Sequence, residues 1–231
     1  MGNASRLLAF NGQYRGIDAK TDTLIPSQQP SARKLLRKAD CYQQKFIKYP
    51  HVGIFHSYAE LIHAALLESD EDVESFVPQP FLFRIGKRRY PPDCYVVKNG
   101  KRYIIELKPA GELPDETRIP MEEFCRLENI TFKVISNESI LEREQFALNW
   151  LKIVRTLNSA IDVDSHSQEL QIMDRLFEIS NCEVGDIIFE GDRLGQCAFE
   201  IGLFRLAHKG LIKLELDKKH LGYSTVVRLC T

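Results

Sequence analysis

The sequence lacks the features that would place it in a membrane or hold it together by disulfides or zinc. No apolar run approaches the roughly 18 residues that a membrane span needs. The six cysteines include no C-x-x-C pair and no zinc-ligand spacing, which predicts separate, reduced thiols. The first residues also lack a basic segment followed by a long apolar core, so we expect no secretory signal. These absences predict a cytoplasmic protein with no membrane partner.

The chain also has little net charge, only −1, but the charge is unevenly distributed. Residues 1–56 carry nine Lys or Arg against three Asp or Glu, a net of +6, whereas residues 57–164 and 165–231 carry −5 and −2. A basic arm ahead of an acidic body is typical of contact with a polyanion. The alternative is a solvated tail, which the composition favours for residues 1–30.

Periodicity and turn signals divide the chain into three parts. Residues 1–39 are rich in turn formers and predict a basic arm. Residues 40–160 follow the order helix, three strands, helix, strand, helix, which predicts an α/β domain with helices flanking a mixed sheet. After a polar break, residues 165–231 show three helices and a strand pair, the outline of a winged helix. Its third helix is only weakly basic, so docking of a protein and reading of DNA both stay open.

The individual elements are predicted from the same patterns. A first strand is expected after Pro80, and a buried strand over residues 131–136. The first C-terminal helix is expected to place Leu170, Met173, Leu176 and Phe177 on its apolar side. The other helices are expected over residues 57–69, 115–129, 138–157, 184–189 and 196–209.

The stretch PPDCYVVKNGKRYIIELK contains the clearest local geometry. Asn99-Gly100 is the strongest short-range signal for a two-residue type I′ turn, because both residue types tolerate a positive φ. Counting outward from this turn places Asp93 opposite Glu106, with Cβ atoms about 4.5 to 5.5 Å apart. Lys108 shares a face with Glu106, because side chains alternate along a strand. Three charged groups therefore converge at the end of an apolar strand pair.

A positive charge is needed beside these acids. Two opposed carboxylates repel each other, and burying them unpaired costs further free energy. The charge is either Lys108 itself, in a structural carboxylate–lysine cluster, or a divalent cation. Mg²⁺ or Mn²⁺ suits Asp93 and Glu106, because these ions prefer oxygen ligands and are held by carboxylates together with substrate phosphates. Lys108 would then stabilise the charge that develops on a phosphate.

Glu60 is the candidate for a further carboxylate. Its spacing from Ser57 also forms a capping box, in which the serine accepts a hydrogen bond from the N3 backbone N–H and the glutamate accepts one from the cap N–H. Considered alone, this spacing favours the structural role.

Together these motifs form a resemblance. Pro92-Asp93 followed by Glu106-Leu107-Lys108 resembles the PD-(D/E)xK nuclease signature. The longer stretch HSYAELIHAALLESDEDVESFVPQPFLFRIGKRRYPPDCYVV is similar to the TnsA family, the endonuclease subunit of Tn-seven-like heteromeric transposases. The similarity covers about residues 45–136, with Pro91 as an extra residue in the family's Tyr-Pro-Asp phrase. The matching residues are Glu60, Val73, Ser75, Phe76, Gln79, Pro80, Tyr90, Asp93, Glu106 and Lys108.

The resemblance implies a restriction-endonuclease-like fold and a metal-dependent enzyme that cuts DNA at the 5′ ends of a transposon. It implies Glu60, Asp93 and Lys108 as the catalytic set, with Asp93 as the main metal ligand. Some relatives have a neutral glutamine at the position of Glu106, and the hairpin geometry adds this acid, so the predicted ligands of Mg²⁺ or Mn²⁺ are Asp93, Glu106 and Glu60. For Gln79 we prefer a packing and hydrogen-bonding role at a strand edge. The implied partners are double-stranded DNA at transposon ends, a TnsB-like transposase and a TnsC-like ATPase, in a bacterial cytoplasm beside the nucleoid.

Three other functions use the same residues differently. A stand-alone PD-(D/E)xK nuclease in repair or restriction would share the site and cleave alone. A catalytically inactive adaptor that binds DNA or protein would keep the fold and lose the metal, but the intact acid-x-Lys strand argues against it. A structural carboxylate cluster in an unrelated α/β protein is the third.

Overall fold

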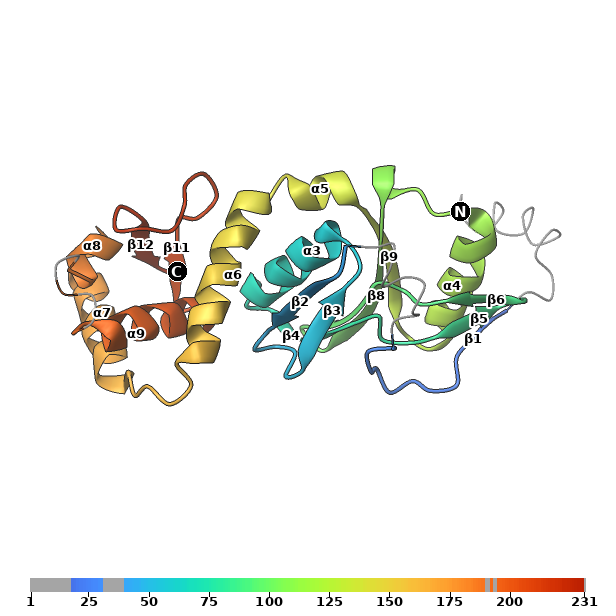
Figure 1. Ribbon diagram of the computed structural model, residues 1–231, viewed down its shortest axis with the longest axis horizontal. Coiled ribbons are helices and arrows are strands. Elements are labelled where there is room, and N and C mark those ends of the chain that lie inside the picture. The colour runs from blue at the N-terminus through green and yellow to red at the C-terminus, as the bar shows by residue number, and fades with distance from the viewer. Residues whose placement is uncertain (1–17, 31–39, 190–191, 193–194, 231) are drawn as a thin grey trace. The chain divides into compact units, whose positions relative to one another are not determined.

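The computed structural model describes residues 18–30, 40–189, 192 and 195–230 (Figure 1). Helices and strands are interspersed over these ranges, which confirms the predicted α/β class. None of the helices in these ranges is long and apolar enough to cross a bilayer. Most of the predicted basic arm lies outside the described residues, and its described part contains the short strand β1 (Ala19–Lys20).

The chain folds into two compact units, each built from two stretches of the sequence. The predicted domains, residues 40–160 and 165–231, do not coincide with these units, because the chain enters each of them twice. Unit 1 comprises Met1–Asp40 and Glu74–Ser139, and unit 2 comprises Cys41–Val73 and Ile140–Thr231.

A four-stranded mixed sheet belongs to unit 1. In spatial order its strands are β4 (Val73–Pro78), β7 (Cys94–Lys98), β8 (Lys101–Lys108) and β9 (Thr131–Ser136). The pair β7–β8 is antiparallel and the pair β8–β9 is parallel. A parallel pair needs a long crossover, and this one contains the 3₁₀ turn Pro109–Gly111 and the helix α4 (Asp115–Leu127).

Two expectations about this sheet are corrected. The strand predicted after Pro80 exists as β5 (Phe83–Ile85), but it belongs to another sheet, and β4 before the proline joins β7 instead. The chain leaves the ladder after Pro78, because Gln79 has a positive φ of 44° and Pro80 has no N–H to donate. The strand β9 is half-buried or exposed rather than buried, because it lies at the edge of the sheet.

A three-stranded sheet with the order β1-β5-β6 completes unit 1, with β6 at Arg88–Tyr90. Side chains alternate along β5, so Phe83 and Ile85 are buried while Arg84 is exposed. The Phe83 ring packs edge-on against Phe124 of α4, with centroids 4.9 Å apart. Both sheets and α4 therefore share one core. Its members are Ala19, Phe81, Phe83, Ile85, Tyr95, Ile104, Met121, Cys125 and Ile130.

Unit 2 combines helices with two small sheets. The predicted helix over 138–157 is interrupted, and its α5 and α6 parts are separate helices. The helix α6 contacts both α3 and α9, which draws it into the same unit as the C-terminal helices. The elements are β2 (Tyr42–Lys45), β3 (Val52–Phe55), α3 (Tyr58–Ser69), α5 (Asn137–Leu141, which begins in unit 1), α6 (Glu144–Ser159), α7 (His166–Ile179), β10 (Asn181–Glu183), α8 (Val184–Ile187), α9 (Cys197–His208), β11 (Ile212–Leu214) and β12 (Val226–Leu229).

The predicted apolar side of α7 is only partly correct. Leu176 is buried together with Ile172, which lies one turn before it. In contrast, Leu170 and Phe177 are exposed, by 54% and 69%. The buried side of the helix is instead formed by Ile172 and Leu176, and Glu169 on the same side pairs with Lys209 beyond the end of α9.

Gly100 in the β7–β8 turn provides a test of the hairpin. We expect Gly100→Ala to lower the free energy of unfolding by about 1 kcal/mol, because its φ of +69° disfavours any Cβ although no atom lies within 4 Å of one. Gly222→Ala is the matched control, because its Cβ would also meet open space, with the nearest atom at 3.9 Å, and its φ is not in the left-handed region. Urea denaturation of both variants measures the difference. Equal stability of the two would contradict the assigned turn.

Candidate active site

The predicted hairpin brings the acids of unit 1 together. The strand register is the predicted one, and its last pair is Cys94 with Ile105. Asp93 immediately precedes β7 and Glu106 follows Ile105 in β8, so the two acids lie just beyond this last pair. The backbone N–H of Leu107 donates to Asp93 Oδ2 at 2.7 Å, which ties this carboxylate to the end of β8.

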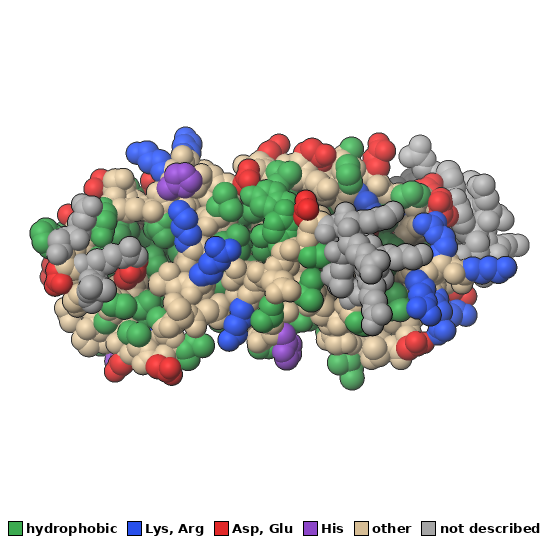
Figure 2. Space-filling view, in the orientation of Figure 1, with side chains coloured by type: hydrophobic (Ala, Val, Ile, Leu, Met, Phe, Trp, Pro, Cys, Tyr) green, Lys and Arg blue, Asp and Glu red, His purple; other side chains and the backbone are tan. Residues whose placement is uncertain are grey.

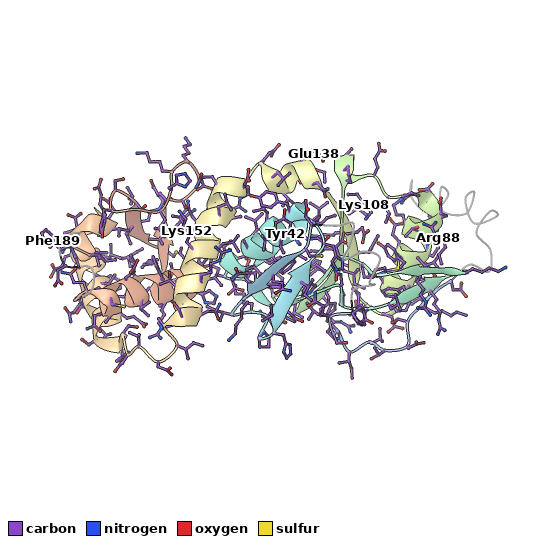
Figure 3. The ribbon with its side chains drawn as sticks, in the orientation of Figure 1. Tyr42, Arg88, Lys108, Glu138, Lys152 and Phe189 are labelled. Carbon is purple, nitrogen blue, oxygen red and sulfur yellow. The ribbon has the colours of Figure 1, made fainter. Side chains whose placement is uncertain are left out.

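Glu106 is the buried centre of this cluster. Its side chain is only 1% exposed, and its Oε1 forms an ion pair with the Lys108 ammonium group. The Lys108 side chain is 34% exposed, so this cation reaches the surface from the end of β8 (Figure 3). Glu106 Oε2 is buried and has no hydrogen-bond partner among the described residues. One carboxylate oxygen is therefore satisfied by lysine, and the other lies near the Tyr90 hydroxyl but outside hydrogen-bond geometry.

The electrostatic balance at Glu106 is unfavourable to its charged form. Burial raises the pKa of this carboxyl group, and the charge and hydrogen bond of Lys108 oppose that rise without cancelling it. The ion pair with Lys108 thus repays only part of the cost of removing the carboxylate from water. A second positive charge beside Oε2 would lower the remaining cost.

Tyr90, the last residue of β6, also faces the cluster. Its hydroxyl oxygen is buried and has no partner in hydrogen-bond geometry among the described residues. Burial raises the pKa of Tyr90, and the negative charges of Glu106 and Asp93 raise it further. The hydroxyl therefore keeps its proton beside the two acids. The sequence reasoning did not include Tyr90 among the site residues, because the spacing in Tyr-Pro-Pro-Asp does not reveal the direction of its ring.

Gln79 supports Asp93 through the backbone. Its N–H donates to the Asp93 carbonyl oxygen at 2.9 Å, and its own carbonyl accepts from the N–H of Gln29 at 2.9 Å. This agrees with the predicted hydrogen-bonding role at a strand edge. A non-glycine residue with a positive φ costs on the order of 1–3 kcal/mol, and such strain concentrates at functional sites. The backbone hydrogen bond from Gln79 thus helps to fix the position of Asp93 in the acidic cluster.

Glu60 belongs to unit 2 and begins α3. Its backbone N–H donates to Ser57 Oγ at 3.2 Å, as the capping box predicts. Its side chain accepts from the backbone N–H of His56 and from the Ser57 hydroxyl, each at 3.1 Å. The glutamate therefore reaches back to His56 and not to the N–H of Ser57. The structure gives this carboxylate a structural role, and its predicted place beside Asp93 stays a prediction.

The donor set in unit 1 consists of two carboxylates. No group of three or more His, Cys, Asp or Glu among the described residues is placed to hold a metal ion. Two carboxylates still fit Mg²⁺ or Mn²⁺, because such ions retain several waters and are completed by substrate phosphates. The observation in favour of this fit is the buried, unpartnered Oε2 of Glu106, which has the chemistry of a hard-cation ligand.

The cluster is thus a buried acid with a lysine and a tyrosine at the strand ends of a mixed α/β protein. No model of a known protein family and no curated protein matches the chain. Its function must therefore be argued from the chemistry of this cluster and from the sequence motifs.

The burial of Glu106 predicts a specific dependence of stability on pH. The folded protein binds the Glu106 proton more tightly than the unfolded chain, so the free energy of unfolding falls as pH rises above the usual range of a glutamate. In EDTA, Glu106→Gln should therefore be more stable than the wild type at neutral pH, and the difference should shrink as pH falls toward that range. Thermal unfolding measured across this pH range tests it. A variant that is less stable at neutral pH would show that the Lys108 ion pair outweighs burial.

Proposed function

We propose that the protein is a metal-dependent DNA endonuclease whose active site is the cluster of Asp93, Glu106 and Lys108. The observation that carries the proposal is the buried Glu106 Oε2, which has no partner while Lys108 occupies the other oxygen. A purely structural cluster would gain stability by satisfying that atom. The cost of burying Oε2 in this way is explained if this oxygen binds a cation during the reaction.

The residues take distinct roles in this proposal. Asp93 and Glu106 would hold Mg²⁺ or Mn²⁺, which when bound supplies Lewis acidity toward water and the scissile phosphate. Lys108 extends from the buried acid toward the surface and would donate to a non-bridging phosphate oxygen, stabilising the charge that develops in the transition state. Tyr90 keeps its proton beside the two acids and so adds no further negative charge to the site. Glu60 remains the third ligand that the TnsA resemblance implies.

The order of elements supports a PD-(D/E)xK fold. The helix α3 is followed by β4 and the β7–β8 hairpin, and α4 then leads into β9, which pairs in parallel with β8. This is the helix, three strands, helix, strand order that the nuclease resemblance implies. In the C-terminal stretch, the order α7, β10, α8, α9, β11, β12 with sheet order β10-β12-β11 supports a winged helix.

The substrate and partners are proposed from the sequence resemblance. The TnsA-like stretch supports cleavage at the 5′ ends of a transposon, together with a TnsB-like transposase and a TnsC-like ATPase. The bacterial cytoplasm beside the nucleoid is the location that this activity requires.

For the winged helix we propose a protein partner rather than the reading of duplex DNA. The three basic groups at the C-terminal end of α9 are all engaged inside unit 2. Arg205 donates to the Val163 carbonyl and to Ser165 Oγ, both at 2.7 Å. His208 contacts the fully buried Glu68 at 2.7 Å, and Lys209 pairs with Glu169 at 2.6 Å. Because these basic groups are engaged within unit 2, the helix has little positive charge available to bind DNA phosphates.

Lys108→Ala tests the catalytic assignment. We expect it to slow Mg²⁺-dependent nicking of transposon-end DNA at least about 100-fold, because it removes a cation that stabilises the transition state. Lys101→Ala, an exposed lysine at the other end of β8, should leave nicking unchanged. Unfolding curves of both variants show whether the fold is kept. Normal nicking by a folded Lys108→Ala protein would refute the assignment.

The same assay separates the related functions when it is run with and without a TnsB-like transposase. Cleavage only in the presence of the transposase supports the transposition role. Efficient cleavage of unrelated DNA by the chain alone favours a stand-alone nuclease. No cleavage under either condition, together with no Mn²⁺ binding by the wild type, favours the inactive adaptor or the structural cluster.

A further inference from the structure

A strongly basic hairpin leads directly into the acidic cluster. The strands β5 and β6 pair with Ile85 opposite Arg88, so Gly86-Lys87 forms a two-residue turn. Gly86 has a positive φ of 58°, which allows the tight reversal. Figure 2 shows Lys and Arg side chains gathered over the end of this hairpin. Its four exposed cations, named here the basic hairpin, are Arg84, Lys87, Arg88 and Arg89.

The charges of the basic hairpin are poorly balanced within the protein. Arg84 lies directly opposite Arg89 in the strand register, and like charges in that position destabilise a hairpin. Arg84 forms an exposed ion pair with Asp22, and Arg88 lies 3.6 Å from Glu116. These exposed pairs contribute little. Among the described residues, Lys87 and Arg89 form no ion pair. The concentration of cations therefore favours an anionic partner.

The basic hairpin is close to the proposed active site along the chain. Tyr90, whose hydroxyl faces Glu106, directly follows Arg89. Asp93 lies four positions after Arg89, and an extended chain of that length spans at most about 14 Å. Duplex DNA carries one phosphate charge per about 1.7 Å of its axis, so about eight phosphate charges lie within that reach of the cleaved bond.

We infer that the basic hairpin binds the phosphate backbone of the DNA beside the bond to be cut, and so places that bond at Asp93 and Glu106. This inference rests on the proposed nuclease function and adds the surface that positions the substrate. The contacts are to phosphates, because an exposed arginine or lysine on a turn neutralises charge without reading base edges.

An anionic membrane is the competing partner for such a patch. The strength of binding to a lipid surface scales with the apolar area that enters the bilayer as well as with the attraction of cations to anionic lipid. The apolar residues of β5, Phe83 and Ile85, are instead buried in the core of unit 1. The turn itself offers only Gly86 and Lys87. The hairpin therefore fits a polyanion and not a lipid surface.

The salt dependence of DNA binding tests this inference. The hairpin variant Lys87→Ala/Arg88→Ala/Arg89→Ala is compared with Lys101→Ala/Arg126→Ala/Lys133→Ala, which removes three exposed cations elsewhere in unit 1. Fluorescence anisotropy of a labelled duplex in EDTA measures affinity without cleavage. We expect the hairpin variant alone to lower the slope of log K against log salt by about 2 to 3, since each lost phosphate contact contributes about 0.9. Its affinity should fall at least about 10-fold at about 0.1 M salt, equally for unrelated sequences.

The outcomes separate this inference from the proposed function. If the hairpin and control variants bind alike while wild-type cleavage depends on Mg²⁺ and Lys108, the inference is wrong and the nuclease stands. If the hairpin variant alone loses DNA binding but the wild type never cleaves, the hairpin assignment survives and the nuclease does not. Loss of binding to anionic vesicles without loss of DNA binding, or a wild type that binds no duplex, overturns the inference.

Discussion

The burial of the Glu106 carboxylate is the interaction on which the site depends. A carboxylate on a strand whose neighbours are apolar loses most of its hydration, and the partly exposed Lys108 recovers only part of that free energy. The surrounding structure holds the arrangement in place through strong local constraints. The Asn99-Gly100 turn sets the register, and the backbone of Leu107 holds Asp93 beside it. In the proposed function, this residual cost is what would favour a bound cation.

One short stretch of chain joins the basic hairpin, the proposed DNA-binding surface, to the proposed active site. The β5–β6 hairpin exposes its four cations, while the buried Phe83 and Ile85 of β5 anchor it in the core that it shares with α4. Tyr90 ends this hairpin and faces Glu106, so the proposed DNA-binding surface and the buried acid are joined by a short stretch of chain. In unit 2, by contrast, the basic groups at the end of α9 form ion pairs with Glu68 and Glu169 and hydrogen bonds with backbone carbonyls.

Much of unit 1 could be predicted from local patterns. The hairpin, α4 and β9 follow from turn residues and periodicity, and the convergence of Asp93, Glu106 and Lys108 follows from counting positions away from the turn. Other expectations were wrong where contacts between segments distant in the sequence decide which residues are buried. Patterning placed Leu170 and Phe177 inside, but α7 packs against α9 with Ile172 and Leu176 buried instead. The helix α6 joined the C-terminal elements because its partners, α3 and α9, are distant in sequence.

The sequence by itself determined the register that sets two acids and a lysine together, because a two-residue turn and the period of a strand are local properties. It also determined the cap of α3 by Ser57 and the cations of the β5–β6 turn. Only the tertiary structure decided that Glu106 Oε2 is left without a partner and that the Tyr90 hydroxyl faces it. The burial and the direction of a side chain depend on contacts between elements far apart in the chain. A local sequence pattern therefore does not predict either property.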